Sequence, residues 1–211
     1  MINVLLVEDD HMARQLLEIY INKSKKYNLV ASVESALFAE AFCRAHCVDV
    51  VLMDVCTAMN ANGIDASAEI KRRFPETKII VITSQPECSY ITRARLAGVD
   101  SFWYKSATAQ EIIAIMDRTI EGESIYPDNT PMLKLGDAQS EKFSERALDV
   151  LRLVVAGETD AAIAEKLHIS VATVKTHIQN MKNRTGFRNR TELAVKARES
   201  GLVISDHKSE E

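Results

Sequence analysis

Five short apolar runs alternate with helical stretches over the first 121 residues, and this alternation limits the possible folds more than any other feature. The runs are INVLLV, NLVASV, VDVVLM, KIIVIT and DSFWY, at residues 2–7, 28–33, 48–53, 78–83 and 100–104. Apolar residues recur at helical spacing in HMARQLLEIYINK and near residues 35–46, 64–74, 87–97 and 107–121. Strands that alternate with helices predict βαβ units, and therefore a parallel sheet with helices on both faces.

The connections between these elements restrict the order of the strands. Right-handed crossovers between parallel strands leave few topologies for such a chain. We expect an α/β domain over residues 1–122, with a flavodoxin-like, doubly wound, five-stranded parallel sheet of order 2-1-3-4-5. The alternation then stops in GESIYPDNTPMLKLGDAQSEK, which has two prolines and two glycines. We expect a linker over residues 123–140, with room for a strand or turn that packs on the first domain.

The charges divide the chain at the same place. Residues 1–140 carry 14 basic and 19 acidic side chains, whereas residues 141–203 carry 11 basic and 8 acidic ones. Within the second block, residues 170–190 hold five Lys and Arg and no acid. Such an asymmetry indicates two domains with different partners. We expect an all-helical second domain at 141–203 and a polar tail at 204–211.

Composition disfavours several classes of protein. The chain has 211 residues, of which 46% are apolar, enough for a packed core. Its longest apolar runs fall far short of the roughly 20 residues of a membrane span, and MINVLLVEDD lacks the basic start of a signal peptide. The four cysteines form no C-x-x-C pair, so a reduced, cytoplasmic setting is expected. CRAHC at 43–47 offers too few ligands for tetrahedral zinc.

Asp54 is a carboxylate inside an apolar strand, where uncompensated burial costs several kcal/mol. Ligands of open parallel sheets bind at the carboxyl ends of the strands, where Asp54 stands. Glu8 and Asp9 end the first strand, Thr83 ends the fourth, and Lys105 follows the fifth. Because clustered carboxylates repel one another, we expect a Mg²⁺ ion there, with Lys105 and Thr83 placed to hold a phosphoryl group. Asp54 is then a nucleophile that becomes an acyl phosphate.

With these residues in place, VLLVEDD, VVLMD, IIVITS and DSFWYKS resemble, in order and spacing, the receiver domain of two-component response regulators. The resemblance covers about residues 2–122. It implies that Asp54 accepts its phosphoryl group from a sensor histidine kinase. It also implies that Asp9 binds Mg²⁺ directly, and that Glu8, Asp54 and the backbone carbonyl of Cys56 complete the metal site.

The same resemblance assigns the residues that respond to phosphorylation. Lys105 would pair with the phosphoryl group, and Thr83 and Phe102 would be the switch hydroxyl and the switch aromatic. Phosphorylation would then draw Thr83 toward a phosphoryl oxygen and let Phe102 turn inward.

The loop after the acceptor departs from the family pattern. Thr57 and Ala58 stand where the family has Met and Pro, and Gly63 follows the acceptor by nine residues in place of eight. We expect a loop one residue longer and more mobile, because no proline fixes a backbone angle there.

Four helices are predicted in the second domain, from SERALDVLRLVVAG, TDAAIAEKLHI, SVATVKTHIQNMKNRTG and RNRTELAVKARESGL. The third begins with Ser170, a favourable N-cap residue. Val171, Val174, Ile178 and Met181 step along one face of it, and polar or basic residues occupy the other. Two short helices joined by a tight turn, the second basic on its open face, describe a helix-turn-helix.

TVKTHIQNMKNRTG, with NRTELA behind it, resembles the LuxR-type helix-turn-helix of NarL/FixJ-type regulators over about residues 141–203. The resemblance makes 170–184 the recognition helix in the major groove of double-stranded DNA. The implied candidates for base edges are Lys175, Thr176 and Gln179. The implied candidates for phosphates are Ser170, Thr173, His177, Lys182 and Arg184. GETDAAIAEKL departs from the family, which often has an Asn and a Glu near Asp160 and Ala162. We therefore expect a different local packing of the first helix of the helix-turn-helix, here called the scaffold helix.

Together these features predict a response regulator, not an enzyme, that dimerises on phosphorylation or on DNA and regulates transcription. Two alternatives remain. A haloacid-dehalogenase-like phosphatase would use Asp54 as its nucleophile, but Cys56 stands where that family has its general acid. A DNA-binding regulator whose receiver acts without phosphorylation is supported only by the altered loop. Acyl-phosphate labelling with and without Mg²⁺ separates the three readings.

Overall fold

The computed structural model describes residues 1–84, 87, 89–105, 108–127 and 133–203. Residues 1–84 and 90–127 belong to one compact unit, and residues 133–203 belong to a second. The polar tail predicted at 204–211 lies outside the described residues, as does part of the predicted linker. Every described helix is too short or too polar to span a lipid bilayer.

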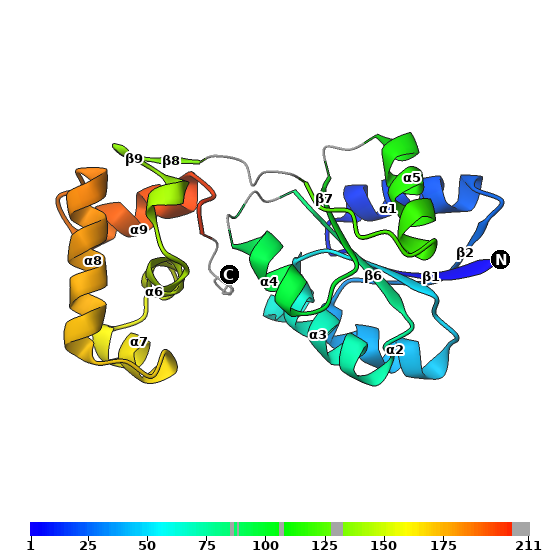
Figure 1. Ribbon diagram of the computed structural model, residues 1–211, viewed down its shortest axis with the longest axis horizontal. Helices are drawn as coiled ribbons and strands as arrows, with labels where there is room; N and C mark the ends of the chain where they lie inside the picture. The colour runs from blue at the N-terminus through cyan, green and yellow to red at the C-terminus, as the bar shows by residue number, and fades with distance from the viewer. Residues whose placement is uncertain (85–86, 88, 106–107, 128–132, 204–211) are drawn as a thin grey trace. The chain divides into compact units, whose positions relative to one another are not determined.

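The first unit is built on a five-stranded parallel sheet (Figure 1). Its strands are β1 (Ile2–Val7), β2 (Tyr27–Val33), β3 (Val50–Met53), β6 (Lys78–Thr83) and β7 (Ser101–Tyr104). They pair in the order β2-β1-β3-β6-β7, which confirms the predicted order 2-1-3-4-5. Each strand begins and ends within two residues of its predicted run.

Helices cover both faces of this sheet (Figure 1). One face carries α1 (His11–Lys23) and α5 (Ala109–Ile120). The other carries a 3-10 turn (Ala36–Phe38), α2 (Ala39–Ala45), α3 (Gly63–Arg73) and α4 (Tyr90–Leu96). The helical segments predicted from spacing are therefore confirmed, and α4 begins three residues later than predicted.

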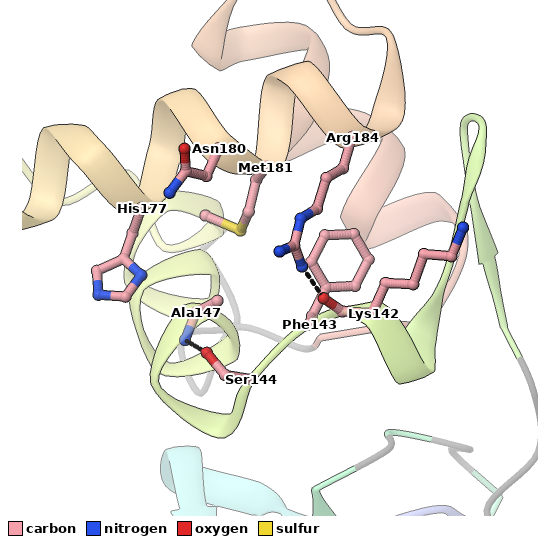
Figure 2. A pocket seen from close by; sticks show the side chains of 8 residues that line it. All are labelled: Lys142, Phe143, Ser144, Ala147, His177, Asn180, Met181 and Arg184. Carbon is pink, nitrogen blue, oxygen red and sulfur yellow. Dashed lines mark hydrogen bonds between the residues drawn. The ribbon is translucent and has the colours of Figure 1, made fainter.

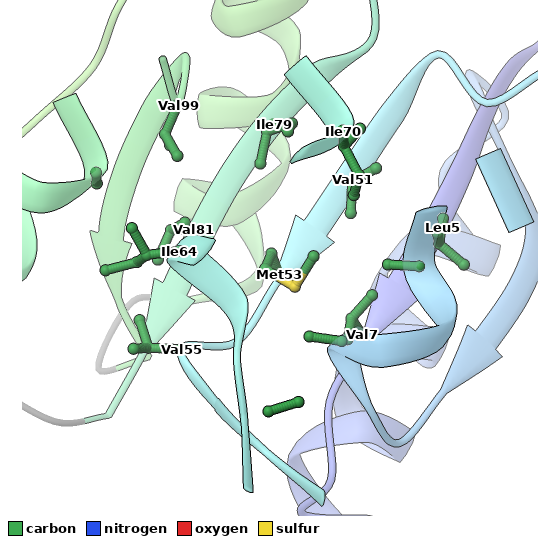
Figure 3. Packing of buried hydrophobic residues seen from close by; sticks show 14 of the residues in the cluster. Leu5, Val7, Val51, Met53, Val55, Ile64, Ile70, Ile79, Val81 and Val99 are labelled. Atoms are coloured by element: carbon green, nitrogen blue, oxygen red, sulfur yellow. The ribbon is translucent and has the colours of Figure 1, made fainter. Parts of the chain in front are cut away.

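Side chains of the central strands divide between the two faces by simple alternation. In β1, β3 and β6 the odd-numbered residues, such as Val7, Met53 and Val81, face the layer of α2, α3 and α4 (Figure 3). The even-numbered residues, such as Leu6 and Leu52, face α1 and α5. Both sets are buried. Burial on two faces explains why these strands read as continuous apolar runs.

The outer face of α1 is more apolar than its packing requires. Leu17 and Ile21 are its buried residues. Met12 is 80% exposed and Leu16 and Ile19 are each 48% exposed. Helical spacing therefore predicted the helix, but part of its apolar stripe faces solvent.

The second unit contains a hairpin and four helices. The hairpin strands are β8 (Lys134–Leu135) and β9 (Ala138–Gln139), and a 3-10 turn (Ser140–Lys142) follows. The helices are α6 (Glu145–Val155), α7 (Asp160–Lys166), α8 (Val171–Thr185) and α9 (Arg190–Glu199). Each starts after a polar residue whose side chain accepts a backbone N–H bond, and these caps are Ser144, Thr159, Ser170 and Asn189.

The hairpin lies within the stretch predicted as a linker, yet it packs in the second unit. Leu135 and Ala138 are buried in that unit's core. The Asp137 N–H donates to the Thr185 carbonyl at the end of α8, over 3.1 Å. Gly136 has a φ of 58°, and a Cβ there would lie 2.1 Å from the Thr185 carbonyl oxygen. Only glycine fits this turn, so the hairpin is a built part of the unit.

Candidate functional site

Three carboxylates meet at the carboxyl edge of the sheet. Glu8 and Asp9 follow β1, Asp54 follows β3, and the last residues of these two neighbouring strands are paired with each other. One oxygen from each carboxylate lies within 4.8 Å of the other two. Glu8 and Asp54 are buried, and Asp9 is half-buried. The structure thus brings together the acids that the strand order predicts at one edge.

Lys105 lies across the two buried carboxylates. Its Nζ is 2.6 Å from Glu8 Oε2 and 2.8 Å from Asp54 Oδ2. The Lys105 backbone N–H donates to the carbonyl of Thr83 over 2.8 Å, which fixes the residue at the end of the sheet. Asp54 Oδ1 accepts the N–H of Val55 over 2.7 Å. Both carboxylate oxygens of Asp54 therefore have a donor, which offsets the cost of burying the group.

Burial governs the protonation of this cluster. Desolvation, reinforced by the charge of Asp54, raises the pKa of Glu8 to about 7. Desolvation also raises the pKa of Asp54, against the opposing effect of Lys105. Burial alone would lower the pKa of Lys105, but the charges and hydrogen bonds of Asp54 and Glu8 together outweigh it, and that pKa is raised. With one cation for three carboxyl groups, the cluster can accept further positive charge.

The donor set at this edge fits a hard divalent cation. All three side chains of the cluster offer carboxylate oxygens, which Mg²⁺ prefers. Cys56, whose backbone carbonyl is the expected further ligand, is half-buried two residues after the acceptor. Its thiol sulfur lies 3.5 Å from the Tyr90 hydroxyl oxygen. Mg²⁺ needs only a few protein oxygens, because it keeps several of its own waters, and this cluster supplies them.

Thr83 and Phe102 lie on adjacent strands and are both fully buried. The Phe102 ring stacks on Tyr126 with a centroid distance of 6.2 Å. It also meets Tyr104 edge-on at 5.5 Å. The sequence predicts that Phe102 turns inward on phosphorylation, but the ring already lies inside. In this structure the ring therefore does not start from an exposed position, as the predicted inward turn requires.

The loop after the acceptor is a small hairpin. Its strands are β4 (Cys56–Thr57) and β5 (Ala61–Asn62), which pair antiparallel around a 3-10 turn (Ala58–Asn60). Thr57 Oγ1 donates to the Ala61 carbonyl and accepts the Ala36 N–H, each over 2.9 Å. Met59 and Asn60 take φ values of 63° and 55°, inside the turn. A hydrogen-bonded hairpin takes up the extra residue, where the sequence predicts a mobile loop.

The hairpin returns the chain to Gly63, which lies against the acceptor's own backbone. The Gly63 N–H donates to the Val55 carbonyl over 2.8 Å. A Cβ at Gly63 would lie 1.9 Å from the Asp54 carbonyl oxygen, closer than atoms can approach. Asn62 then caps α3, its side chain accepting the Ile64 N–H over 2.9 Å. The first residue of α3 therefore lies directly against the backbone of Asp54 and Val55.

In the second unit, α8 presents a polar face to solvent. Its buried stripe consists of Val174, Ile178, Met181 and Thr185. Val171, predicted in that stripe, is 40% exposed. The structure leaves exposed the three residues predicted to contact base edges, namely Lys175, Thr176 and Gln179.

The residues predicted to contact phosphates lie around that face. Ser170 caps α8 by accepting the Thr173 N–H over 3.0 Å, and both residues are exposed. His177 and Lys182 are half-buried. Lys182 Nζ lies 3.2 Å from Gln179 Oε1, so it borders the face predicted to contact base edges. Arg184, the remaining candidate, is exposed.

Arg184 borders a pocket of about 450 Å³ between α8 and the start of α6 (Figure 2). Its guanidinium donates to the backbone carbonyl of Lys142. His177 lies at the other end of the pocket, and Asn180 extends from α8 between them (Figure 2). Phe143 forms part of the apolar lining.

Sequence reasoning placed Asn183 on the polar face of α8 without giving it a DNA contact, and it missed Asn180 on the same open side. Both are exposed, and the Gln179 side-chain amide donates to Asn183 Oδ1 over 2.8 Å. The helical period would have identified Asn180, because it follows Thr176 by four residues. The scaffold helix α7 also has a partner not predicted, since Arg190 forms an ion pair with Asp160.

Two known families match these two units. Residues 4–117 match the response regulator receiver domain. Residues 141–197 match the luxR family of bacterial regulatory proteins. The first match covers the sheet and its acidic edge, and the second covers the four helices.

Two relatives match over nearly their whole length. The chain is 30% identical over 210 residues to the response regulator protein VraR of Staphylococcus epidermidis, covering 96% of this chain and 99% of that protein. It is equally similar to VraR of Staphylococcus aureus, with the same coverage.

Solved structures show the same fold. The RcsB response regulator of Salmonella typhimurium matches with a TM-score of 0.59 and 20% identity, over 92% of this chain and 98% of that one. ChrA, a response regulator of a heme-sensing two-component system, matches with a TM-score of 0.53 and 23% identity, over 95% of this chain and 98% of that one. A structure of RcsB dimers bound to DNA matches with a TM-score of 0.62 and 19% identity, over 92% of this chain and 96% of that one.

Proposed function

Since the chain belongs to the response regulators that join a receiver domain to a LuxR-type DNA-binding domain, we propose that phosphorylation of Asp54 controls its binding to DNA. Regulation of transcription within a two-component system is the activity of this family. The observation that carries the proposal is the placement of Asp54, buried beside Glu8 and Asp9 with Lys105 on its Oδ2.

Asp54 is the nucleophile of the proposed transfer. One of its oxygens attacks the phosphorus of a phosphohistidine on a sensor histidine kinase. The new O–P bond forms as the N–P bond breaks, and the kinase imidazole leaves with its electron pair. Lys105, now 2.8 Å from Asp54 Oδ2, supplies a positive charge for the phosphoryl oxygens.

The residues that would hold Mg²⁺ are Asp9, Glu8, Asp54 and the backbone carbonyl of Cys56. A bound Mg²⁺ would neutralise negative charge on the transferred group and help to align it. Asp9 is the best exposed of the three carboxylates, and Glu8 and Asp54 lie deeper. This arrangement supports Asp9 as the direct ligand, with Glu8 held in place by Lys105.

Thr83 and Phe102 are the proposed switch residues, with a modified role for the aromatic ring. Thr83 ends β6, and its backbone carbonyl accepts the Lys105 N–H, so the residue belongs to the same edge of the sheet as Asp54. Phe102 is already buried against Tyr104 and Tyr126. We therefore expect that its ring does not rotate on phosphorylation and that its packing stabilises the active state.

Two exposed surfaces are the proposed binding sites for partners. On α1, which starts directly after the acidic edge, Met12, Leu16 and Ile19 offer an apolar face for the histidine kinase. On α8, the exposed basic and amide side chains offer a face for double-stranded DNA. One recognition helix reads few base pairs, so we expect a homodimer on phosphorylation or on DNA. DNA as ligand also favours a cytoplasmic location.

Labelling of the acceptor tests the proposal. Incubation with a small acyl phosphate and Mg²⁺ should add one phosphoryl group, which Asp54→Asn and Asp54→Ala should abolish. Asp65→Asn, at an exposed position of α3, is the matched control and should label as wild type does. Unchanged labelling of both Asp54 variants would show that the acceptor is another residue.

The hairpin after Asp54 supports one alternative, a regulator that binds DNA without phosphorylation. Its left-handed turn at Met59 and Asn60 departs from the loop that the family pattern predicts. This alternative requires no labelling of wild type, together with DNA binding that acyl phosphate leaves unchanged.

A further inference from the structure

The segment that follows α5 lies along the edge strand of the sheet. β7 is the last strand in the order β2-β1-β3-β6-β7, and such a strand presents backbone N–H and C=O groups along its outer side. Residues 124–126, here called the strap, cover part of that side. The Phe102 N–H donates to the Ile125 carbonyl over 2.8 Å, and the Ile125 N–H donates to Ser101 Oγ over 3.0 Å. The backbone of the strap is therefore attached to the strand that carries the switch aromatic.

The strap is anchored in the core through Ser101. Its Oγ lies 2.7 Å from Thr119 Oγ1, which donates to the Ile115 carbonyl over 2.6 Å. Ser101 and Thr119 are fully buried, and Ile125 is buried with them. The strap thus belongs to the core of the first unit, although it follows the last helix of that unit.

Tyr126 places an aromatic ring against Phe102. The two rings stack with a centroid distance of 6.2 Å and an angle of 16° between their planes. The Tyr126 hydroxyl donates to the Val99 carbonyl over 2.7 Å, and the Arg95 guanidinium of α4 lies 3.9 Å from the Tyr126 ring centroid. Aromatic stacking and cation–π contacts both stabilise such a placement. One side chain of the strap therefore contacts the switch aromatic, the turn before β7, and α4.

A ring that is already held inward limits what phosphorylation can still change. A modification shifts a two-state equilibrium only by the difference in its interactions with the two states. Resting on the proposed function, we propose that the strap holds Phe102 in its inward, active position before Asp54 is phosphorylated, with Tyr126 as the positioning residue. The receiver is then preset, and phosphorylation adds little to the affinity for DNA.

The strap also links the switch to the second unit through the chain itself. Residues 127–132 alone separate Tyr126 from Leu133, the first described residue of the second unit. Tyr126 acts through Phe102 and belongs to the segment that leads to the DNA-binding domain. The position of the switch and the start of the linker therefore depend on one aromatic contact.

Hydrogen exchange in the full-length protein tests whether the strap is docked before phosphorylation. The Phe102 amide reports docking directly, because it donates to the Ile125 carbonyl. In wild type this amide should be protected without phosphorylation, and acyl phosphate with Mg²⁺ should change its exchange little. Fast exchange in wild type that slows only after phosphorylation would overturn the proposal, and this measurement requires no variant.

DNA affinity with and without acyl phosphate tests the consequence. Because only the active fraction binds, Tyr126→Ala should weaken the unphosphorylated protein by at least about fivefold and leave the phosphorylated protein near wild type. Ser101→Ala, which removes the anchor and keeps the ring, should act in the same direction. Tyr126→Phe keeps the stacked ring and should match wild type. The duplex is one that wild type has selected, and labelling of Asp54 is measured for every variant.

Phe74→Ala is the matched control, because Phe74 is a half-buried aromatic residue at the end of α3 that packs against the same core. It should lower stability and leave the stimulation by acyl phosphate at the wild-type ratio. If Tyr126→Ala keeps the wild-type ratio as well, the strap does not hold the switch and the inference fails. If wild type is not labelled on Asp54 or does not bind DNA, the proposed function itself fails.

Discussion

Lys105 forms ion pairs with two acids at once, and these contacts hold the charge of Glu8 and Asp54 in balance. Its Nζ holds Glu8 and Asp54 at 2.6 and 2.8 Å. A buried cation between buried carboxylates compensates their charge and fixes their orientation. Removal of its charge would leave acidic groups buried beside Asp9. The properties of each residue here therefore depend on the other three.

The raised pKa of Glu8 predicts how metal binding depends on pH. The metal competes with a proton on Glu8, whose pKa is about 7. Affinity for Mg²⁺ should therefore rise with pH up to about 7 and level off above it. Below that point it should fall by up to about tenfold per pH unit. The single tryptophan, Trp103, lies two residues before Lys105 and provides a fluorescence signal for the titration.

Glu8→Gln is the control for this titration. It removes the titrating carboxyl group, so its weaker binding should vary far less between pH 6 and pH 8. A Glu8→Gln variant with the wild-type profile would show that another group titrates.

Single substitutions on α8 should separate base contacts from phosphate contacts. Lys175→Ala should lose about 1–3 kcal/mol of binding free energy on the preferred site and little on random DNA. Lys182→Ala should weaken binding to all sequences alike and flatten the salt dependence. Salt titrations of each variant on specific and scrambled duplexes measure both effects. Equal losses for both variants on both duplexes would mean that α8 is oriented differently in the groove.

At the scale of elements, the tight contact between α3 and the acceptor predicts a coupled defect. A Cβ at Gly63 would meet the Asp54 carbonyl oxygen at 1.9 Å, so the backbone must shift. Gly63→Ala should lower the free energy of unfolding by roughly 1–3 kcal/mol and slow labelling of Asp54. Chemical unfolding and acyl-phosphate labelling measure the two losses.

Ala68→Gly, at an exposed position of the same helix, provides the comparison. It should cost about 1 kcal/mol of stability through helix propensity. Labelling of this variant should stay at the wild-type rate, because residue 68 is remote from the Asp54 carbonyl. If Gly63→Ala and Ala68→Gly both label slowly, the labelling defect follows from the loss of stability alone.

The elements that sequence reasoning predicted are those with a strong period. Apolar runs such as 78–83 and the stripe through Val174 and Ile178 are recognisable from local sequence, and so is Asp54, an acid directly after a buried apolar run. The two small hairpins have strands of two residues each, too short for any period. The position of Phe102 depended on packing with Tyr126, which lies 24 residues away in sequence. Such distant contacts leave no local pattern.

At the scale of the whole molecule, the hairpin should contribute much of the stability of the second unit. Leu135 and Ala138 are each 1% exposed within its core. Burial of a leucine side chain alone contributes roughly 1.5–3 kcal/mol. A fragment of residues 133–203 should therefore unfold cooperatively and bind DNA, whereas a fragment of residues 141–203 should be less stable by several kcal/mol. Thermal unfolding of both fragments decides this.

Leu135→Ala in the longer fragment tests the same packing without a truncation. The cost should be roughly 2–5 kcal/mol. Gln139→Ala, at an exposed position of the same hairpin, should cost little. Equal stability of the two fragments would place the hairpin outside the folding unit.

The odd–even division of the strands also determines where the length of this chain can change. One residue added or removed inside β1, β3 or β6 would send every following side chain of that strand to the opposite core. A residue added at 58–60 disturbs no such alternation, because those positions form a turn. Homologous chains should therefore vary in length at this turn and keep a constant length within the strands.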